Sequence, residues 1–199
     1  MTLHDELLSG LGDSGMEQIA GMLGSDTPTA RQVLEAVTGA IVGGMARNAE
    51  HPDGADALRG ALDDHTDTDP FNADVASLTR DGHSILGHVL GGHGTEHVAA
   101  GIARHTGVGT GPLMKLMPLI APMVMCLLAD HVAGRDMDAA TLAEDLAREE
   151  AHLPPDLAEL VDGLLNGIFG TPQAGAYDPF GGPERTGRQA IPGTRNRRW

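Results

Sequence analysis

Apolar residues recur at three- and four-residue steps along most of the chain, a spacing that places them on one face of an α-helix. The clearest stripe consists of Val33, Leu34, Val37, Ile41 and Met45. No run alternates apolar and polar positions as a half-buried strand does, and aromatic residues make up only 3% of the chain. The pattern therefore predicts an all-α protein.

The apolar pattern occurs twice along the chain. Apolar residues and glycines coincide with those of a later segment at an offset of 79, and then at 80 after one inserted residue. Val37 falls on Met117 in this comparison, and both should be buried at equivalent places. The order of matches predicts two tandem four-helix units of about 80 residues, at about 3–65 and 82–145.

The first unit is expected to contain four helical pieces. Thr27 is the expected N-cap of the third piece, because Pro28 suits a first helical turn. Gly39 and Gly43 lie four apart in that piece, where small residues let another helix approach closely. The four expected pieces are Leu3–Ser9, Met16–Leu23, Pro28–Arg47 and Asp53–Asp64.

The second unit is expected to have its own core helix. Pro118 and Pro122 lie inside it and predict a kink or a late start, because proline removes a helix hydrogen bond. The apolar run Leu116–Ala129 is shorter than the roughly 20 residues of a membrane-spanning helix, so we expect a buried helix and no membrane. The expected buried positions are Leu113, Met117, Ile120, Ala121, Val124 and Leu128.

Composition divides the remainder of the chain. The segment Thr66–His83 is polar and is expected to be a connector with one short helix, and Pro155–Phe169 shows the stripe of a closing helix. Together these elements predict a single helical domain at 1–170. The segment 171–199 is rich in Gly, Pro and Arg, lacks periodicity and is predicted to be a disordered basic tail.

The net charge of the chain makes some classes of binding partner unfavourable. The net charge of the chain is −15, and the tail carries five arginines against two acids, which leaves −18 on residues 1–170. An acidic surface opposes both DNA and anionic lipid, so we predict no nucleic-acid and no membrane partner. The one cysteine and the absence of a signal-peptide pattern predict a cytoplasmic protein. The expected contact of an unknown protein partner is the end of the tail, namely Arg195, Arg197, Arg198 and Trp199.

Histidines supply the main chemical alternative. Clustered imidazoles hold transition metals when two or three converge, but glycines at 91, 92 and 94 interrupt this cluster and no HExxH motif or cysteine partner accompanies it. We predict no metal and no cofactor, with a histidine-cluster metal-binding protein as the alternative. His88 is expected to bond a neighbouring carbonyl within a helix. The weak metal candidates are His83, His88, His93, His97 and His105.

A second alternative is a DNA-associated regulator. The stretch Ile19–Leu34 resembles a helix-turn-helix, with Arg31, Gln32 and Glu35 as the polar residues of its second helix. That helix then turns apolar, and the net charge opposes DNA, so a structural helix pair is favoured. No catalytic triad or carboxylate pair is indicated by the spacing. We therefore predict no catalytic residue and favour a non-enzymatic interaction or scaffold protein.

Three stretches carry a family resemblance. They are Ser-Ile-Leu-Gly-His-Val-Leu-Gly-Gly at 84–92, Leu-Met-Pro-Leu-Ile-Ala-Pro-Met-Val-Met at 116–125, and Met-Ala-Arg-Asn-Ala-Glu-His-Pro-Asp-Gly-Ala at 45–55 continuing into Ala-Leu-Asp-Asp-His at 61–65. The chain resembles the YidB-like family of uncharacterised bacterial proteins, domain-of-unknown-function family 937, over about Leu3 to Ala133. The resemblance implies a compact all-helical fold and no reaction, because that family has none assigned.

Overall fold

The computed structural model describes residues 2–65, 71 and 74–170. Within these residues the chain forms eight helices and no strand, which confirms the all-α prediction. The predicted disordered tail lies outside the described residues. The helices are α1 (Leu3–Leu23), α2 (Thr27–Ala49), α3 (Pro52–Asp63), α4 (Val75–Val89), α5 (Gly94–Thr106), α6 (Thr110–Arg135), α7 (Ala139–Glu150) and α8 (Pro155–Phe169).

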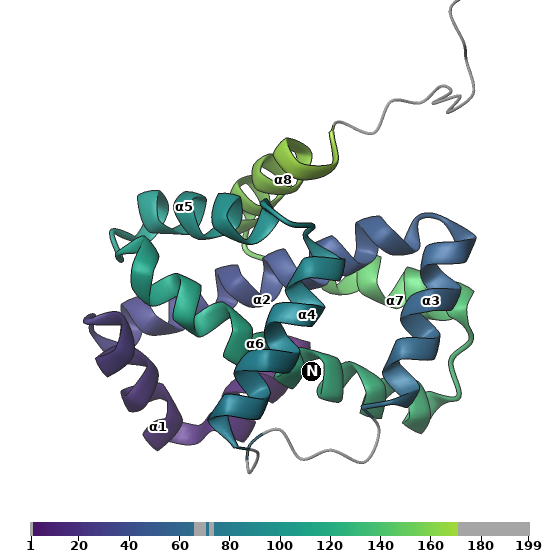
Figure 1. The fold of residues 1–199 in the computed structure, drawn as a ribbon, viewed down its shortest axis with the longest axis horizontal. Helices are drawn as coiled ribbons and strands as arrows, with labels where there is room; N and C mark the ends of the chain where they lie inside the picture. Colours follow the sequence, from purple (N-terminus) through teal and green to yellow (C-terminus); the bar gives the residue numbers. More distant parts are fainter. Residues whose placement is uncertain (1, 66–70, 72–73, 171–199) are drawn as a thin grey trace, which may run out of the picture.

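Helix α2 crosses the middle of the molecule (Figure 1) and contacts all seven other helices described. Every residue from 36 to 46 is buried, so the apolar stripe seen in the sequence is only part of the buried surface. A helix that is covered on every side needs no polar face, because no part of its middle meets water.

Glycines let neighbouring residues lie directly on the α2 backbone. An ideal Cβ at Gly43 would lie 2.6 Å from Leu165 Cδ1 of α8, and one at Gly39 would lie 2.9 Å from Leu153 Cδ1 in the loop before α8. The two leucine side chains thus occupy the space that a side chain on α2 would need. The predicted close approach of another helix is confirmed at Gly43, where α8 packs, whereas at Gly39 the close neighbour is a loop residue.

Helix α6 is the second long core helix. It runs without interruption through Pro118 and Pro122, so the predicted late start is wrong. The prolines are tolerated because α6 has extensive packing, above all with α4. All six positions expected to be buried are buried: Leu113, Met117, Ile120, Ala121, Val124 and Leu128.

Helices α4 and α6 meet at a backbone carbonyl that lacks its helical hydrogen bond because of a proline. Pro122 has no N–H, so the carbonyl of Pro118 cannot make its usual helical hydrogen bond. Gly82 of α4 lies against that carbonyl, and an ideal Cβ on Gly82 would lie only 1.7 Å from Pro118 O. The two backbones therefore touch at a point where only glycine fits.

Helix α6 is also the one helix in the described part of the chain that is long and apolar enough to cross a membrane by length and composition. Within its most apolar window, 67% of the residues are buried inside the protein. Burial of this kind is equally found in the core helix of a globular protein.

Several predicted boundaries need correction. The two helical pieces expected before Leu23 are present, joined as α1 across a kink at Gly12, whose φ of 61° suits glycine, so only their inner ends differ from the prediction. The N-cap of α2 is Asp26 and not Thr27, because the Asp26 carboxylate accepts the Thr29 N–H at 2.9 Å. Each correction has a local cause in one side chain or one glycine.

The predicted connector Thr66–His83 is too long. Helix α4 begins at Val75, where the Asp74 carboxylate accepts the Ser77 N–H at 3.1 Å and caps the first turn. Most of the connector before Asp74 lies outside the described residues. At the other end of the domain, the closing helix α8 spans the residues predicted for it.

The tandem repeat remains a prediction. Val37 and Met117 are both completely buried, as the repeat requires. The two halves are interlocked, because α1 packs on both α2 and α6, and α7 packs on both α2 and α3. Burial at two positions does not establish that the units superpose.

Candidate functional site

The five candidate histidines lie on α4, at the start of α5 and along α5, and all are exposed. His93 has a fully exposed side chain, whereas His97 lies against Gly167 of α8. His88 Nδ1 lies 2.7 Å from the Ser84 carbonyl oxygen, which confirms the bond expected for it. In the described ranges no group of three or more His, Cys, Asp or Glu is placed to hold a metal ion.

His88 also lies at the edge of an apolar groove between α3 and α4, called here the α3–α4 groove. The groove has a volume of about 400 Å³, within the range of ligand-binding pockets. Its lining residues are Met45, Asn48, Gly54, Ala57, Leu58, Ala61, His65, Ser84, Ile85, His88, Val89 and Met125.

Four helices build the α3–α4 groove. Met45 of α2 and Met125 of α6 are buried lining residues, and Ala57 and Ala61 of α3 are exposed. Asn48 holds one end in place, since its side-chain amide donates to the carbonyls of Gly44 and Val89, both at 2.9 Å. Sequence reasoning placed Met45 on the apolar stripe and Met125 only in a family motif, because spacing alone does not reveal an opening beside them.

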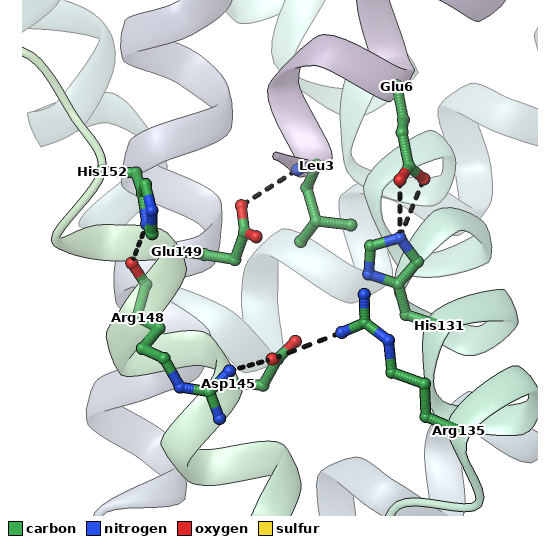
Figure 2. Close-up of polar contacts among 8 residues, drawn as sticks. All are labelled: Leu3, Glu6, His131, Arg135, Asp145, Arg148, Glu149 and His152. Carbon is green, nitrogen blue, oxygen red and sulfur yellow. Dashed lines mark hydrogen bonds and ion pairs between the residues drawn. The ribbon is translucent and has the colours of Figure 1, made fainter. Parts of the chain in front are cut away.

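A second, polar hollow lies where α1 begins. Thr2 and Asp5 form a capping box at this end of the helix, which satisfies two backbone N–H groups. The N–H of Leu3 donates to Glu149 Oε2 of α7 at 2.9 Å, as drawn in Figure 2. The start of α1 is thus fixed to the end of α7 by a carboxylate that complements the positive end of the helix.

Further polar contacts secure the same corner (Figure 2). His131 Nε2 of α6 lies 2.8 and 2.9 Å from the two carboxylate oxygens of Glu6. Asp145 is 4% exposed, and its Oδ1 accepts from Arg148 at 2.8 Å and lies 3.6 Å from Arg135 Nη1. These pairs hold α1, α6 and α7 together.

The polar hollow, called here the α1–α7 cavity, has a volume of about 180 Å³. Three of its lining residues have a buried polar atom without a hydrogen-bond partner among the described residues: His4 Nδ1, Thr38 Oγ1 and Glu150 Oε1. The complete lining is Thr2, Leu3, His4, Asp5, Glu35, Thr38, Gly39, Val42, Glu149, Glu150, His152 and Leu153.

Burial shifts the pKa values of two lining residues, His4 and Glu150, in opposite directions. Burial lowers the pKa of His4 below its usual 6.5, against the pull of Glu35 and Asp5, so the neutral imidazole is favoured. Burial raises the pKa of Glu150, and the nearby Arg47 only partly offsets it. Sequence reasoning missed both, because the cavity joins segments more than 100 residues apart.

Two candidates from the sequence remain, namely the DNA-reading helix and the basic tail. A DNA-reading helix must expose a polar face, but α2 exposes Arg31 and Gln32 only at its start and is buried from 36 to 46. The structure therefore favours the structural helix pair. The tail residues Arg195, Arg197, Arg198 and Trp199 lie outside the described residues.

Comparison with known proteins gives one match. The family model described as a bacterial protein of unknown function, DUF937, matches residues 5–131, which is more than half of the chain. No curated protein and no solved structure matches the chain significantly. The match runs from α1 into α6 and includes the whole α3–α4 groove, but it ends before α7. The chain therefore belongs to the DUF937 family of bacterial proteins of unknown function.

Proposed function

We propose that the protein is a non-enzymatic interaction protein whose α3–α4 groove receives an apolar segment of a protein partner. The observation that carries this proposal is an open groove of about 400 Å³ between two helices, with Met45 and Met125 in its lining. Methionine side chains are flexible and polarisable, so they adapt to different apolar surfaces. Grooves between helices commonly hold the apolar face of a partner helix.

The chemistry around the α3–α4 groove defines the partner further. Small side chains at Ala57 and Ala61 leave room for a bulky apolar residue to enter. The exposed face of α3 carries Asp53 and Asp56, and residues 1–170 have a net charge of −18. An apolar segment with Arg or Lys on its outer side fits both features, because its charges would oppose those of the body.

Photo-crosslinking tests the proposal. A photoreactive residue in place of Ala57 should give a discrete adduct in cells, and one in place of Glu144, an exposed residue of α7 outside the groove, should not. Ala61→Trp in the Ala57-labelled protein should abolish the adduct, because the indole fills the groove. Equal adducts from both positions, or an adduct that survives Ala61→Trp, would refute a groove-specific partner.

The same proposal includes a cytoplasmic location and a contact through the basic tail. Five arginines beside a terminal tryptophan suit an acidic protein surface, since guanidinium groups pair with carboxylates and tryptophan is a common binding anchor. Deleting Arg195 to Trp199 should remove a partner from an affinity pull-down while the melting temperature stays constant. An unchanged set of partners would show that the tail contributes no binding.

Direct assays address the two rival functions. A metal-binding protein would retain stoichiometric zinc through dialysis and lose it in a His93/His97 double alanine variant. A DNA-binding protein would shift DNA at low salt and release it steeply as salt rises, because phosphate contacts displace counterions. The exposed separate histidines and the buried α2 support neither rival.

A further inference from the structure

We propose that the segment 195–199 docks in the α3–α4 groove of its own chain, with the Trp199 indole between the two helices. The inference rests on the proposed function, because it names what covers the same groove before a partner arrives. The segment itself lies outside the described residues. Four features of the chain support this occupant: the place where α8 ends, the length of chain after it, the charges beside the groove, and the groove lining.

Helix α8 ends close to the α3–α4 groove (Figure 1). In its last turn Ile168 packs on the start of α5, where an ideal Cβ on Gly94 would lie 3.3 Å from Ile168 Cδ1. Gly94 follows Val89, a lining residue of the groove, by five positions, so the two are at most about 17 Å apart. The chain therefore leaves α8 near the end of the groove that α4 forms.

The chain after α8 is long enough to reach the groove. The 24 residues from 171 to 194 connect Gly170 with Arg195, and they span up to about 80 Å when fully extended. A Gly-rich linker of this length has ends about 25–30 Å apart on average, and a domain of 170 residues is about 40 Å across. The tether thus holds segment 195–199 near the groove at an effective concentration on the order of 1 mM.

Exposed acids flank the groove. Asp53 precedes the exposed lining residue Ala57 by four residues, so the two lie side by side on α3. Asp64 follows the second exposed alanine, Ala61, by three residues. Asp81 lies one turn before the part of α4 that lines the groove, and no lining residue is lysine or arginine. The proposed segment carries three arginines and no acid, so its charge complements these acids.

The groove lining suits an indole ring. Aromatic side chains bury about 150–250 Å² each, and the thioethers of Met45 and Met125 make favourable contacts with such rings. His88 supplies a polar contact at the edge of the groove. Its Nδ1 donates to the Ser84 carbonyl at 2.7 Å, so in the neutral ring Nε2 is left to accept the indole N–H of Trp199.

Two other hollows suit this segment less well. The hollow between α1, α4 and α6 already holds the ring of Phe71, which lies on Gly10. The α1–α7 cavity has a volume of about 180 Å³, less than half that of the groove. The α3–α4 groove is an apolar hollow whose described lining contains no phenylalanine, tyrosine or tryptophan.

The docked segment regulates access to the groove. A segment that binds with a dissociation constant of about 0.1 mM, tethered at about 1 mM, covers the groove about nine-tenths of the time and weakens a partner's apparent affinity about tenfold. A partner that displaces Trp199 also frees the arginines of the tail. These arginines then meet an acidic surface of the same partner, so displacement and capture belong to one binding event.

Trp199 reports its own burial in the full-length protein, because it is the one tryptophan of the chain. Docking predicts emission at a shorter wavelength than that of free tryptophan, with protection from a soluble quencher, independent of protein concentration. Ala61→Phe fills the groove and should return the emission to that of free tryptophan, whereas Ala100→Phe, on the exposed side of α5, should not. Wild-type emission equal to that of free tryptophan would refute docking, and emission that shifts with protein concentration would refute docking within one chain.

Paired arginine variants test whether segment 195–199 is the part that docks. Arg197→Gln/Arg198→Gln should shift the Trp199 emission towards that of free tryptophan. Arg185→Gln/Arg188→Gln removes the same charge from the tail outside the segment and should leave the emission unchanged. Equal shifts from the two pairs would reduce the contact to a general attraction between tail and body, and would overturn the proposal.

Photo-crosslinking of the purified protein separates this inference from the proposed function. A photoreactive residue in place of Ala57 should crosslink to residues 195–199 within the monomer, and one in place of Glu144 should not, as read by mass spectrometry. A tail crosslink without any adduct in cells would refute the partner and support the tail contact. An adduct in cells without a tail crosslink in the purified protein would support the partner and refute the tail contact.

Discussion

Helices α2 and α6 are both long and central, but they achieve close packing in opposite ways. In α2 the glycines belong to the buried helix itself, and leucine side chains of neighbouring elements fill the space above Gly39 and Gly43. In α6 the buried helix carries prolines, and the glycine belongs to the neighbour, since Gly82 of α4 lies on the Pro118 carbonyl. At one contact side chains meet backbone, whereas at the other backbone meets backbone.

The difference predicts unequal tolerance to substitution. A leucine side chain that meets a new methyl group can change its rotamer, at a modest cost. A carbonyl oxygen held inside a helix cannot move without displacing the helix. The contact at α6 should therefore be the more sensitive of the two, although α2 has more neighbours.

Gly82→Ala should have the largest effect. The added Cβ would lie 1.7 Å from Pro118 O, so α4 must move away from α6, and we expect a loss of about 4 kcal/mol or more in unfolding free energy. Urea unfolding measures the loss. Gly87→Ala on the same helix is the control, because nothing lies within 4 Å of its new methyl group and helix propensity should increase stability slightly. Equal effects of the two substitutions would contradict the close backbone contact.

Met117→Ala should come next. Met117 is completely buried, and removing its side chain leaves a cavity that costs about 3 kcal/mol. Val37→Ala, at the position predicted to be equivalent on α2, removes fewer atoms and should cost about 2 kcal/mol. Thermal and urea unfolding of both variants check these values. A loss below about 0.5 kcal/mol in either variant would be inconsistent with the burial observed.

Gly43→Ala should cost less than either core truncation. The new methyl group would meet Leu165 Cδ1 at 2.6 Å, but a side-chain tip can move aside, and alanine favours the helix over glycine by up to about 1 kcal/mol. We expect a net loss of about 1–2 kcal/mol by chemical denaturation. A loss as large as that of Gly82→Ala would remove the distinction between the two contacts.

The smallest effect concerns pH at the polar cavity, which α2 borders through Thr38. Burial holds the pKa of His4 below its unfolded value of 6.5, so the folded state binds fewer protons than the unfolded state as pH falls through 6.5. Stability should therefore decrease from pH 7.5 to 5.5, and His4→Gln should flatten this decrease.

The contribution of Glu150 to the pH dependence of stability must be separated from that of His4. The raised pKa of Glu150 changes stability with pH in the opposite direction. Its proton binds more tightly in the folded state, so its contribution to stability decreases as pH rises from about its unfolded value of 4.5. Thermal melts of Glu150→Gln over the same pH range isolate that contribution. A pH profile of His4→Gln identical to that of the wild type would exclude His4 as the source of the decrease.

The sequence predicted where the helices lie along the chain better than it predicted the local contacts that each helix makes. The closing helix α8 and the buried face of α6 were predictable because apolar periodicity reports directly on burial. Two local features were not: Asp26 as the cap of α2 and the start of α4 at Val75. These depend on single hydrogen bonds or backbone angles, which a hydrophobic pattern does not encode.

Neither hollow was predictable from the sequence. His4, Thr38 and Glu150 come from three separate elements, and no local spacing connects them. Histidine clustering instead indicated residues 83–105, where the histidines are exposed and, among the described residues, are not grouped to hold a metal ion. Side chains that are close along the chain do not necessarily meet at one site, because a single helix is too short to supply all the residues of a site.

The central place of α2 has a consequence for protein synthesis. A ribosome completes α2 before any residue of α3 to α8 exists, yet these six helices all pack against it. Until Leu165 emerges, the nascent chain carries an apolar helix without its full cover, which is the kind of surface that chaperones bind and that aggregates when left alone. Truncation before α8 should therefore yield an insoluble product, even though the family-matched segment ends at residue 131.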